Sequence, residues 1–236
     1  MTKKIFALVI MTFVAAVIFA ETNFETMPKN TITIDFGPTI IGAIMGSVDD
    51  GVSSSGFGIA AQYERQVLEQ VSAAGRFAYL GWGMIIQGEG FESETGFYSF
   101  SLEGHVRYYP LGEVFFVDGM LGYANLLAAF SAKAVGDEPT SVSFNVSRSY
   151  LKLGTKLGWR ISFGKRGGFT FEPALGYYAG IGLGDTLGIR FAKLAKDGGR
   201  DIENFNAAEF DEIFKILENF IFIGGPRVTL SFGWRF

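Results

Sequence analysis

A serine, a glutamate and the only histidine of the chain follow one another at two-residue steps, as Ser101, Glu103 and His105. These are the residue types of a hydrolytic site, in which a base activates a nucleophile within hydrogen-bond reach. Alternate residues of one strand lie about 7 Å apart at ~3.4 Å per residue, too far for that contact. A single histidine also excludes a metal site with two or more histidine ligands. We therefore expect no enzyme activity, catalytic residue, cofactor or metal, with a lipid-modifying enzyme dependent on His105 as the minor alternative.

The segment that carries these residues, FYSFSLEGHVRYYP, alternates between apolar and polar side chains as a strand does. Its apolar positions are Tyr98, Phe100, Leu102, Val106 and Tyr108. The chain contains eight runs that are long enough to cross a bilayer as tilted strands, which takes about 9–11 residues each. These runs cover residues 31–45, 57–67, 71–84, 97–109, 114–125, 148–163, 169–183 and 226–236.

The connections between these runs are alternately short and long. The short ones are LEQ, PLGE and GKRGG, whereas residues 46–56, 85–95, 126–147 and 184–225 form the long ones. Transmembrane barrels sort their connections in this way, with tight periplasmic turns and longer extracellular loops. The pattern predicts an all-β fold, a closed antiparallel up-and-down eight-stranded transmembrane β-barrel with both mature termini in the periplasm. Pro38 and Pro173 fall inside predicted strands, and we expect a local irregularity at Pro38.

The N-terminal residues, MTKKIFALVIMTFVAAVIFA, place two lysines before an unbroken apolar stretch. This layout is typical of a secretory signal peptide cleaved between Ala20 and Glu21, with an N-terminal membrane anchor as the alternative. The predicted domains are a signal peptide over residues 1–20 and a barrel over residues 21–236. The chain has no cysteine, which excludes disulfides and a lipoprotein anchor. A net charge of −4 gives no support to nucleic-acid binding.

The chain ends on RVTLSFGWRF, in which every second residue is large and apolar: Val228, Leu230, Phe232, Trp234 and Phe236. Because a barrel in lipid can have no unpaired edge, this run must pair with the first run, TITIDFGPTII. The terminal aromatic is then expected to join an interfacial girdle near the short turns. The other members of that girdle are Tyr108, Phe115, Phe163 and Phe169.

This ending resembles the terminal strand of bacterial outer-membrane barrels. The whole mature chain resembles the small OmpA/OmpX/OmpW type in strand number and loop sorting, and HVRYYPLGEVFFVDGMLGY is similar to the middle hairpin of such proteins. The resemblance implies a location in the outer membrane of a diderm, Gram-negative-type envelope. It also implies that the apolar residues of the last run form a C-terminal assembly signal read by the barrel-assembly machinery. The protein would then be porin-like, in contact with outer-membrane lipid and exposed at the cell surface.

The same alternation places charged side chains of both signs inside the barrel: Arg76, Glu103, His105, Arg107, Asp118, Lys152, Lys156, Arg160, Glu172, Arg227 and Arg235. Eight strands enclose an interior about wide enough for side chains to fill. We therefore expect a network of paired charges that fills the lumen. The alternative is a narrow channel or transporter for small solutes, either anions or, if the protein is OmpW-like, small hydrophobic molecules.

The last predicted loop, residues 184–225, contains a segment whose apolar residues recur at helical spacing: Phe210, Ile213, Phe214 and Leu217. We expect this loop to be partly helical. Such a segment would cap the barrel mouth, bind an extracellular ligand or host molecule, or lie on the outer leaflet. Since loops carry function in scaffolds of this kind, we expect a surface-exposed structural or interaction role.

Overall fold

A computed structural model describes residues 30–36, 52–88, 91–134, 141–164, 168–187, 189–190 and 225–236. The expected signal peptide, the irregularity expected at Pro38 and the apolar helix face over residues 210–217 all lie outside these ranges. The described part of the chain contains no helix with the length and apolar character that a membrane crossing requires.

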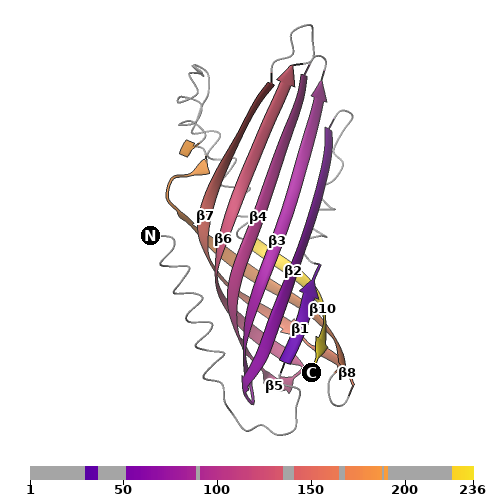
Figure 1. Ribbon diagram of the computed structural model, residues 1–236. Helices are drawn as coiled ribbons and strands as arrows, with labels where there is room; N and C mark the ends of the chain where they lie inside the picture. Colours follow the sequence, from indigo (N-terminus) through magenta and orange to yellow (C-terminus); the bar gives the residue numbers. More distant parts are fainter. Residues whose placement is uncertain are drawn as a thin grey trace.

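Eight strands form a closed antiparallel ring, in which each strand pairs with its neighbours (Figure 1). In ring order they are β1 (Asn30–Asp35), β2 (Val52–Leu68), β3 (Val71–Gly88), β4 (Phe91–Tyr108), β6 (Phe115–Ala134), β7 (Ser141–Trp159), β9 (Gly168–Leu183) and β10 (Gly225–Arg235). Two short strands, β5 (Pro110–Glu113) and β8 (Ile161–Phe163), lie in the connections after β4 and β7. The predicted closed, eight-stranded, up-and-down barrel is confirmed.

The ring closes where β1 meets β10. Their register pairs Ile32 with Trp234 and Ile34 with Phe232. Asn30 and Phe236 exchange two backbone hydrogen bonds of 3.0 and 2.9 Å at the end of this ladder. The last strand also pairs with β9 along its whole length. The predicted pairing of the first and last runs is therefore confirmed, and it closes the ring.

The outer face of the ring is apolar over a continuous band, which we call the apolar belt. Its large side chains include Phe77, Leu121, Leu157, Ile181 and Val228, which are 44–59% exposed. The aromatic residues Tyr108, Phe163, Phe169, Trp159, Trp234 and Phe236 gather at one end of the belt and are exposed there. We call this end the short-turn end, because β2 and β3 are joined there by only Glu69 and Gln70.

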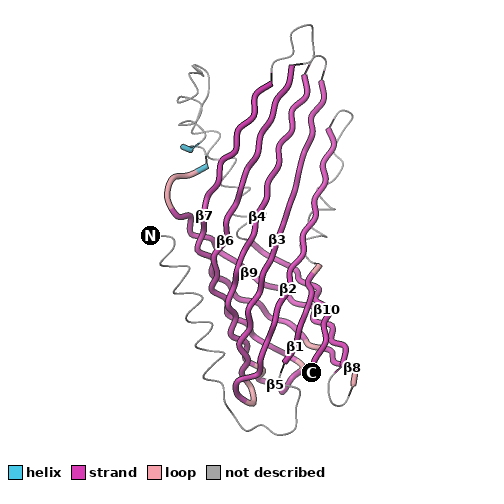
Figure 2. The backbone as a smooth tube through the Cα atoms, viewed as in Figure 1, coloured by secondary structure: helices cyan, strands magenta, loops and turns pink. Residues whose placement is uncertain are grey.

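The barrel wall extends further than the sequence analysis predicted. Residues 85–95 were expected to form a long loop, but β3 runs to Gly88 and β4 resumes at Phe91. Most of the predicted loop 126–147 is likewise strand, because β6 ends at Ala134 and β7 begins at Ser141. β2, β3, β4, β6 and β7 therefore rise past β1 and β10, at what we call the long-strand end (Figure 2). The prediction was wrong here because the alternation is inverted: serine, asparagine and glutamate take outward positions, while apolar residues such as Leu126 and Val146 face inward.

Pro173 is accommodated by an interruption in its neighbour. It lies inside β9 and is paired with Leu230 of β10 on one side. On the other side, the β7 ladder ends at the pair Gly158–Ala174, and pairing resumes in β8 at Ile161–Phe171. Arg160 lies in this gap, outside both strands. A proline has no N–H to donate to a ladder, so the break occurs where no partner could be satisfied.

The apolar belt makes a direct prediction about insertion into a bilayer. Leu121→Arg places a charge on the lipid-facing surface of β6, and we expect it to lower the free energy of unfolding in lipid vesicles by about 2–4 kcal/mol. Asn145→Arg is the matched control, because Asn145 is exposed on the outer face of β7 beyond the belt. This control should cost at most about 1 kcal/mol. Urea titration of both variants checks the difference, and equal costs would contradict a lipid-facing belt.

Candidate functional site

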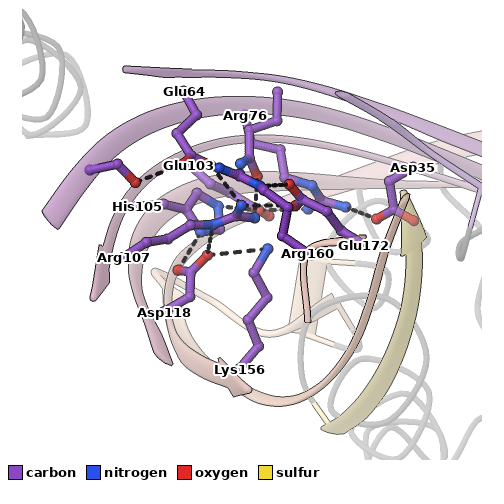
Figure 3. Close-up of polar contacts among 12 residues, drawn as sticks. Asp35, Glu64, Arg76, Glu103, His105, Arg107, Asp118, Lys156, Arg160 and Glu172 are labelled. Carbon is purple, nitrogen blue, oxygen red and sulfur yellow. Dashed lines mark hydrogen bonds and ion pairs between the residues drawn. The ribbon is translucent and has the colours of Figure 1, made fainter. Parts of the chain in front are cut away.

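The lumen near the short-turn end holds a layer of buried charged side chains, which we call the charged layer (Figure 3). Its acidic members are Asp35, Glu64, Glu103, Asp118 and Glu172, and its basic members are Arg76, Arg107, Lys152, Lys156 and Arg160. All of them are at most 6% exposed. They come from seven strands or the ends of those strands. Alternate residues of each strand face the lumen, and each of these strands has one or more polar residues at such positions in this layer.

Arg107 of β4 is the most connected residue of the charged layer. Its Nη1 lies 2.6 Å from Glu64 Oε2 and 2.8 Å from Glu172 Oε2, and its Nε lies 2.7 Å from Asp118 Oδ2. The guanidinium also stacks over the Phe116 ring, with its carbon 4.4 Å from the ring centroid. A planar guanidinium with several fixed donors suits this role, because it can bind carboxylates from three different strands at once.

Arg160 completes the same cluster from the opposite wall. It donates hydrogen bonds of 2.7 Å to Glu64 and 2.6 Å to Glu172. β2, which carries Glu64, and β7, which ends just before Arg160, are four places apart in the ring of eight. The Tyr109 hydroxyl donates a further 2.6 Å hydrogen bond to Glu64, and the Arg160 guanidinium lies 5.2 Å from the Tyr109 ring centroid. These contacts span the full width of the lumen.

Glu103 organises the part of the charged layer that lies further from the short turns. Arg76 donates to it at 2.7 Å, Lys152 at 2.5 Å and the Ser101 hydroxyl at 2.7 Å. Arg76 also reaches Asp35 of β1 at 2.8 Å. Glu103 therefore shares its two carboxylate oxygens among three donors and is buried.

His105 joins the Glu103 and Arg107 clusters. Its Nδ1 lies 2.8 Å from Asp118 Oδ1, and its Nε2 lies 3.4 Å from Glu103 Oε2. Lys156 approaches Asp118 at 3.3 Å. Ser101, the residue type that would serve as a nucleophile, donates to Glu103 and not to the imidazole. The geometry therefore fits a structural bridge between two carboxylates, and not the serine–histidine contact that a nucleophilic site of this type would require.

All eleven lumen residues proposed from the sequence lie on the inward parity. Two of them belong to β10: Arg227 lies 5.5 Å from the Tyr178 ring centroid, and Arg235 is buried. Sequence reasoning missed Asp35 and Glu64, although each bonds to an arginine of the charged layer. The sequence could have placed both residues in the lumen. Ile32 and Ile34 of β1 face outward, as do Phe57 and Tyr63 of β2, so the residues that alternate with them face inward.

Beyond the charged layer the lumen becomes apolar, which the sequence analysis did not predict. This apolar layer consists of Leu80, Trp82, Phe97, Ala124, Leu126, Ala128, Val146, Tyr150 and Leu187. Trp82 and Phe97 stack with ring centroids 5.6 Å apart. Leu187 is fully buried although it follows β9, where Thr186 caps a helical turn by accepting a 3.3 Å bond from the Ile189 N–H. The segment after β9 thus contributes a side chain to the filling of the lumen.

A closed antiparallel ring of eight strands, an apolar exterior and a charged interior together define the small transmembrane β-barrel of the outer-membrane type. No family model matches the sequence, and no curated protein matches it. Among solved structures, the chain resembles Ail, the attachment invasion locus protein of Yersinia pestis, at 14% identity and a TM-score of 0.45. That match covers 89% of this chain and 100% of Ail. A structure of Ail in complex with the heparin analogue sucrose octasulfate matches at 14% identity and a TM-score of 0.43, over the same shares.

The charged layer predicts the cost of removing its most connected member. Arg107→Ala removes the one cation that contacts Glu64, Asp118 and Glu172 together, and we expect the free energy of unfolding to fall by about 3–5 kcal/mol. Adding Glu172→Gln should restore part of the loss, because one buried negative charge is removed. The control is Lys133→Ala, an exposed position on β6, which should change stability by less than about 0.5 kcal/mol. Urea unfolding in vesicles measures all three, and a loss below about 1 kcal/mol for Arg107→Ala would refute the network's role.

Proposed function

We propose that this chain is an integral outer-membrane β-barrel protein with a sealed lumen, which has a structural or interaction role at the cell surface. The observation that carries the proposal is the set of ion pairs across the full width of the lumen. Arg160 and Glu64 come from opposite walls, and Arg107 ties strands β2, β6 and β9 together. A barrel whose interior is filled in this way serves as a rigid support for the loops at its surface.

The charged layer argues against the alternative of an anion channel. Its guanidinium and ammonium groups are already neutralised by carboxylates at hydrogen-bond distance. A passing ion would have to separate these pairs in a site of low dielectric constant, where unpaired charges cost several kcal/mol. The apolar layer adds a second barrier, because the side chains of Phe97, Leu126 and Leu187 present only apolar surface to a hydrated ion.

The proposed orientation places the short-turn end in the periplasm and the long-strand end outside the cell. Small barrels have tight periplasmic turns, and the aromatic girdle at the short turns marks one membrane interface. In this orientation residues 1–20 are a signal peptide, residues 21–236 are the barrel domain, and the assembly machinery reads the apolar residues of β10. Loop 184–225 then lies outside the cell, where a ligand or a host molecule would meet it.

A sealed lumen predicts the electrical behaviour of the purified protein. In planar lipid bilayers we expect no stable unitary currents at moderate voltage, because the charged and apolar layers block the path. A variant lacking residues 191–218 retains Leu187 and all strands, and it should remain equally silent. Regular conductance steps in the intact protein would contradict the sealed lumen, whereas steps only in the shortened variant would show that the last loop is the plug.

The interaction role is tested with the same shortened variant displayed on cells. We expect deletion of residues 191–218 to abolish binding of the cells to host-cell monolayers while the amount of folded barrel stays unchanged. Folded barrel is measured by the shift in gel mobility between heated and unheated samples. Cells that carry Lys133→Ala serve as the control, since this surface change leaves the loop intact. Unchanged binding by the shortened variant would remove the loop from the proposed role.

A further inference from the structure

A shallow groove of about 470 Å³ crosses the outer face of β2, β3 and β4. It lies where the apolar belt gives way to the polar outer surface of the long-strand end. On β2 the outward residues change from Phe57 to Ser55, and on β4 they change from Tyr98 to Glu94. Its volume falls in the range of small-molecule sites, about 300–1,000 Å³. This is a lipid-facing surface that the sealed lumen does not explain.

The floor of the groove is backbone, because glycines occupy adjacent outward positions. Gly83 of β3 pairs with Gly96 of β4, and Gly81 pairs with Tyr98. A Cβ added to Gly96 would lie 2.9 Å from the Tyr98 hydroxyl, and one added to Gly81 would lie 3.0 Å from the Tyr79 hydroxyl. Both tyrosines therefore lie along their own strands toward the long-strand end, and the glycines make room for them. The result is a recess bounded by aromatic rings.

The recess has an apolar end and a polar end. Phe57 and Tyr79 line the end that continues the apolar belt, whereas Ser53, Ser55 and Glu94 line the other end around Ile85. Phe57 is 54% exposed, so a ligand can reach its ring. An amphipathic molecule aligned with the strands would match both ends. Glu94 is the only charged residue among the described residues that line the groove, so its carboxylate favours a head group with an ammonium group over an uncharged one.

We propose that this groove binds one lipid from the surrounding leaflet, with an acyl chain over Gly81 and Gly83 and an amine head group at Glu94. The inference rests on the proposed function, because the groove faces lipid only when the apolar belt is embedded in a membrane. A peptide strand cannot add to β3, since the backbone groups of β3 are already paired with β2 and β4 along the groove. A second copy of the chain is the remaining competitor, and it would appear in the experiment below as a dimer.

Gly83→Phe is the variant that tests the site. A Cβ at Gly83 would meet only the Thr95 carbonyl oxygen, at the ordinary contact distance of 3.7 Å, so the strand tolerates a side chain that fills the groove. Gly119→Phe is the matched control, because Gly119 is exposed on β6 and a Cβ there would meet only the Val106 carbonyl oxygen at 4.0 Å. Glu94→Gln removes the charge and keeps the shape of the polar end.

The measurement is native mass spectrometry of each protein, released from nanodiscs that contain equal amounts of phosphatidylethanolamine and phosphatidylglycerol. We expect the wild type and Gly119→Phe to retain one phosphatidylethanolamine, about tenfold in excess of phosphatidylglycerol. Gly83→Phe should lose about tenfold in lipid retention, because the phenyl ring occupies the acyl position. Glu94→Gln should retain lipid but lose the preference for the amine head group.

Equal lipid retention by Gly83→Phe and Gly119→Phe would overturn the proposal. A wild-type protein that enters nanodiscs folded but carries no lipid would also overturn the proposal. A wild-type protein that forms a dimer through this site would overturn it as well. Failure of the proposed function looks different, since a chain that is not a membrane barrel would not enter nanodiscs and would show no heat-dependent shift in gel mobility. The two ideas therefore fail separately.

Discussion

The structure depends on one constraint, which is that every backbone amide and carbonyl in the lipid-facing wall needs a partner within the wall. In hydrocarbon an unpaired group costs several kcal/mol, and only a closed ladder avoids that cost for strands. The pairing of β1 with β10 meets this demand. Closure fixes the register of every strand relative to its neighbours, and register in turn decides which side chains face the lumen, because a slip of one residue would exchange the two faces. The apolar belt and the charged layer are both consequences of this closure.

A ring of eight strands has an interior of the size that side chains fill, and here the filling differs along the axis. Near the short turns, carboxylates and guanidinium groups neutralise one another across the lumen, with Arg107 bound to three acids. Further along, Trp82, Phe97 and Leu187 replace the charges with apolar packing. Buried charges are tolerated only when each has partners at hydrogen-bond distance. The charged layer therefore holds the walls in a particular arrangement, and the apolar layer excludes water above it.

Filling the lumen moves the sites available for recognition to the exterior. One candidate is the long-strand end, where five strands continue beyond the belt and carry serine, asparagine and glutamate on their outer faces (Figure 1). The other is the groove, in which Gly81 and Gly96 let two tyrosines lie along the sheet and Gly83 has no side chain to fill the space. Aromatic residues with polar tips favour membrane interfaces, since the ring contacts apolar chains and the hydroxyl contacts water. Both sites use the rigid wall as a support for specific surface chemistry.

The sequence by itself determined the strand count, the alternation and the inward parity of residues such as Arg107 and Glu172, because the two-residue period is a local property of a strand. It also predicted the pairing of the first and last runs, since a barrel in lipid can have no edge. It did not reveal where the strands end, because beyond the belt the alternation is inverted, with polar residues facing outward and apolar residues such as Leu126 and Val146 facing inward. Only the tertiary structure decided which charges meet: the partners of Arg107 are 11, 43 and 65 residues away in the sequence. Only the tertiary structure likewise showed that Leu187, which lies in the segment after β9, packs its side chain inside the lumen. Partner choice depends on the relative registers of several strands, and ring closure sets these for the whole barrel at once.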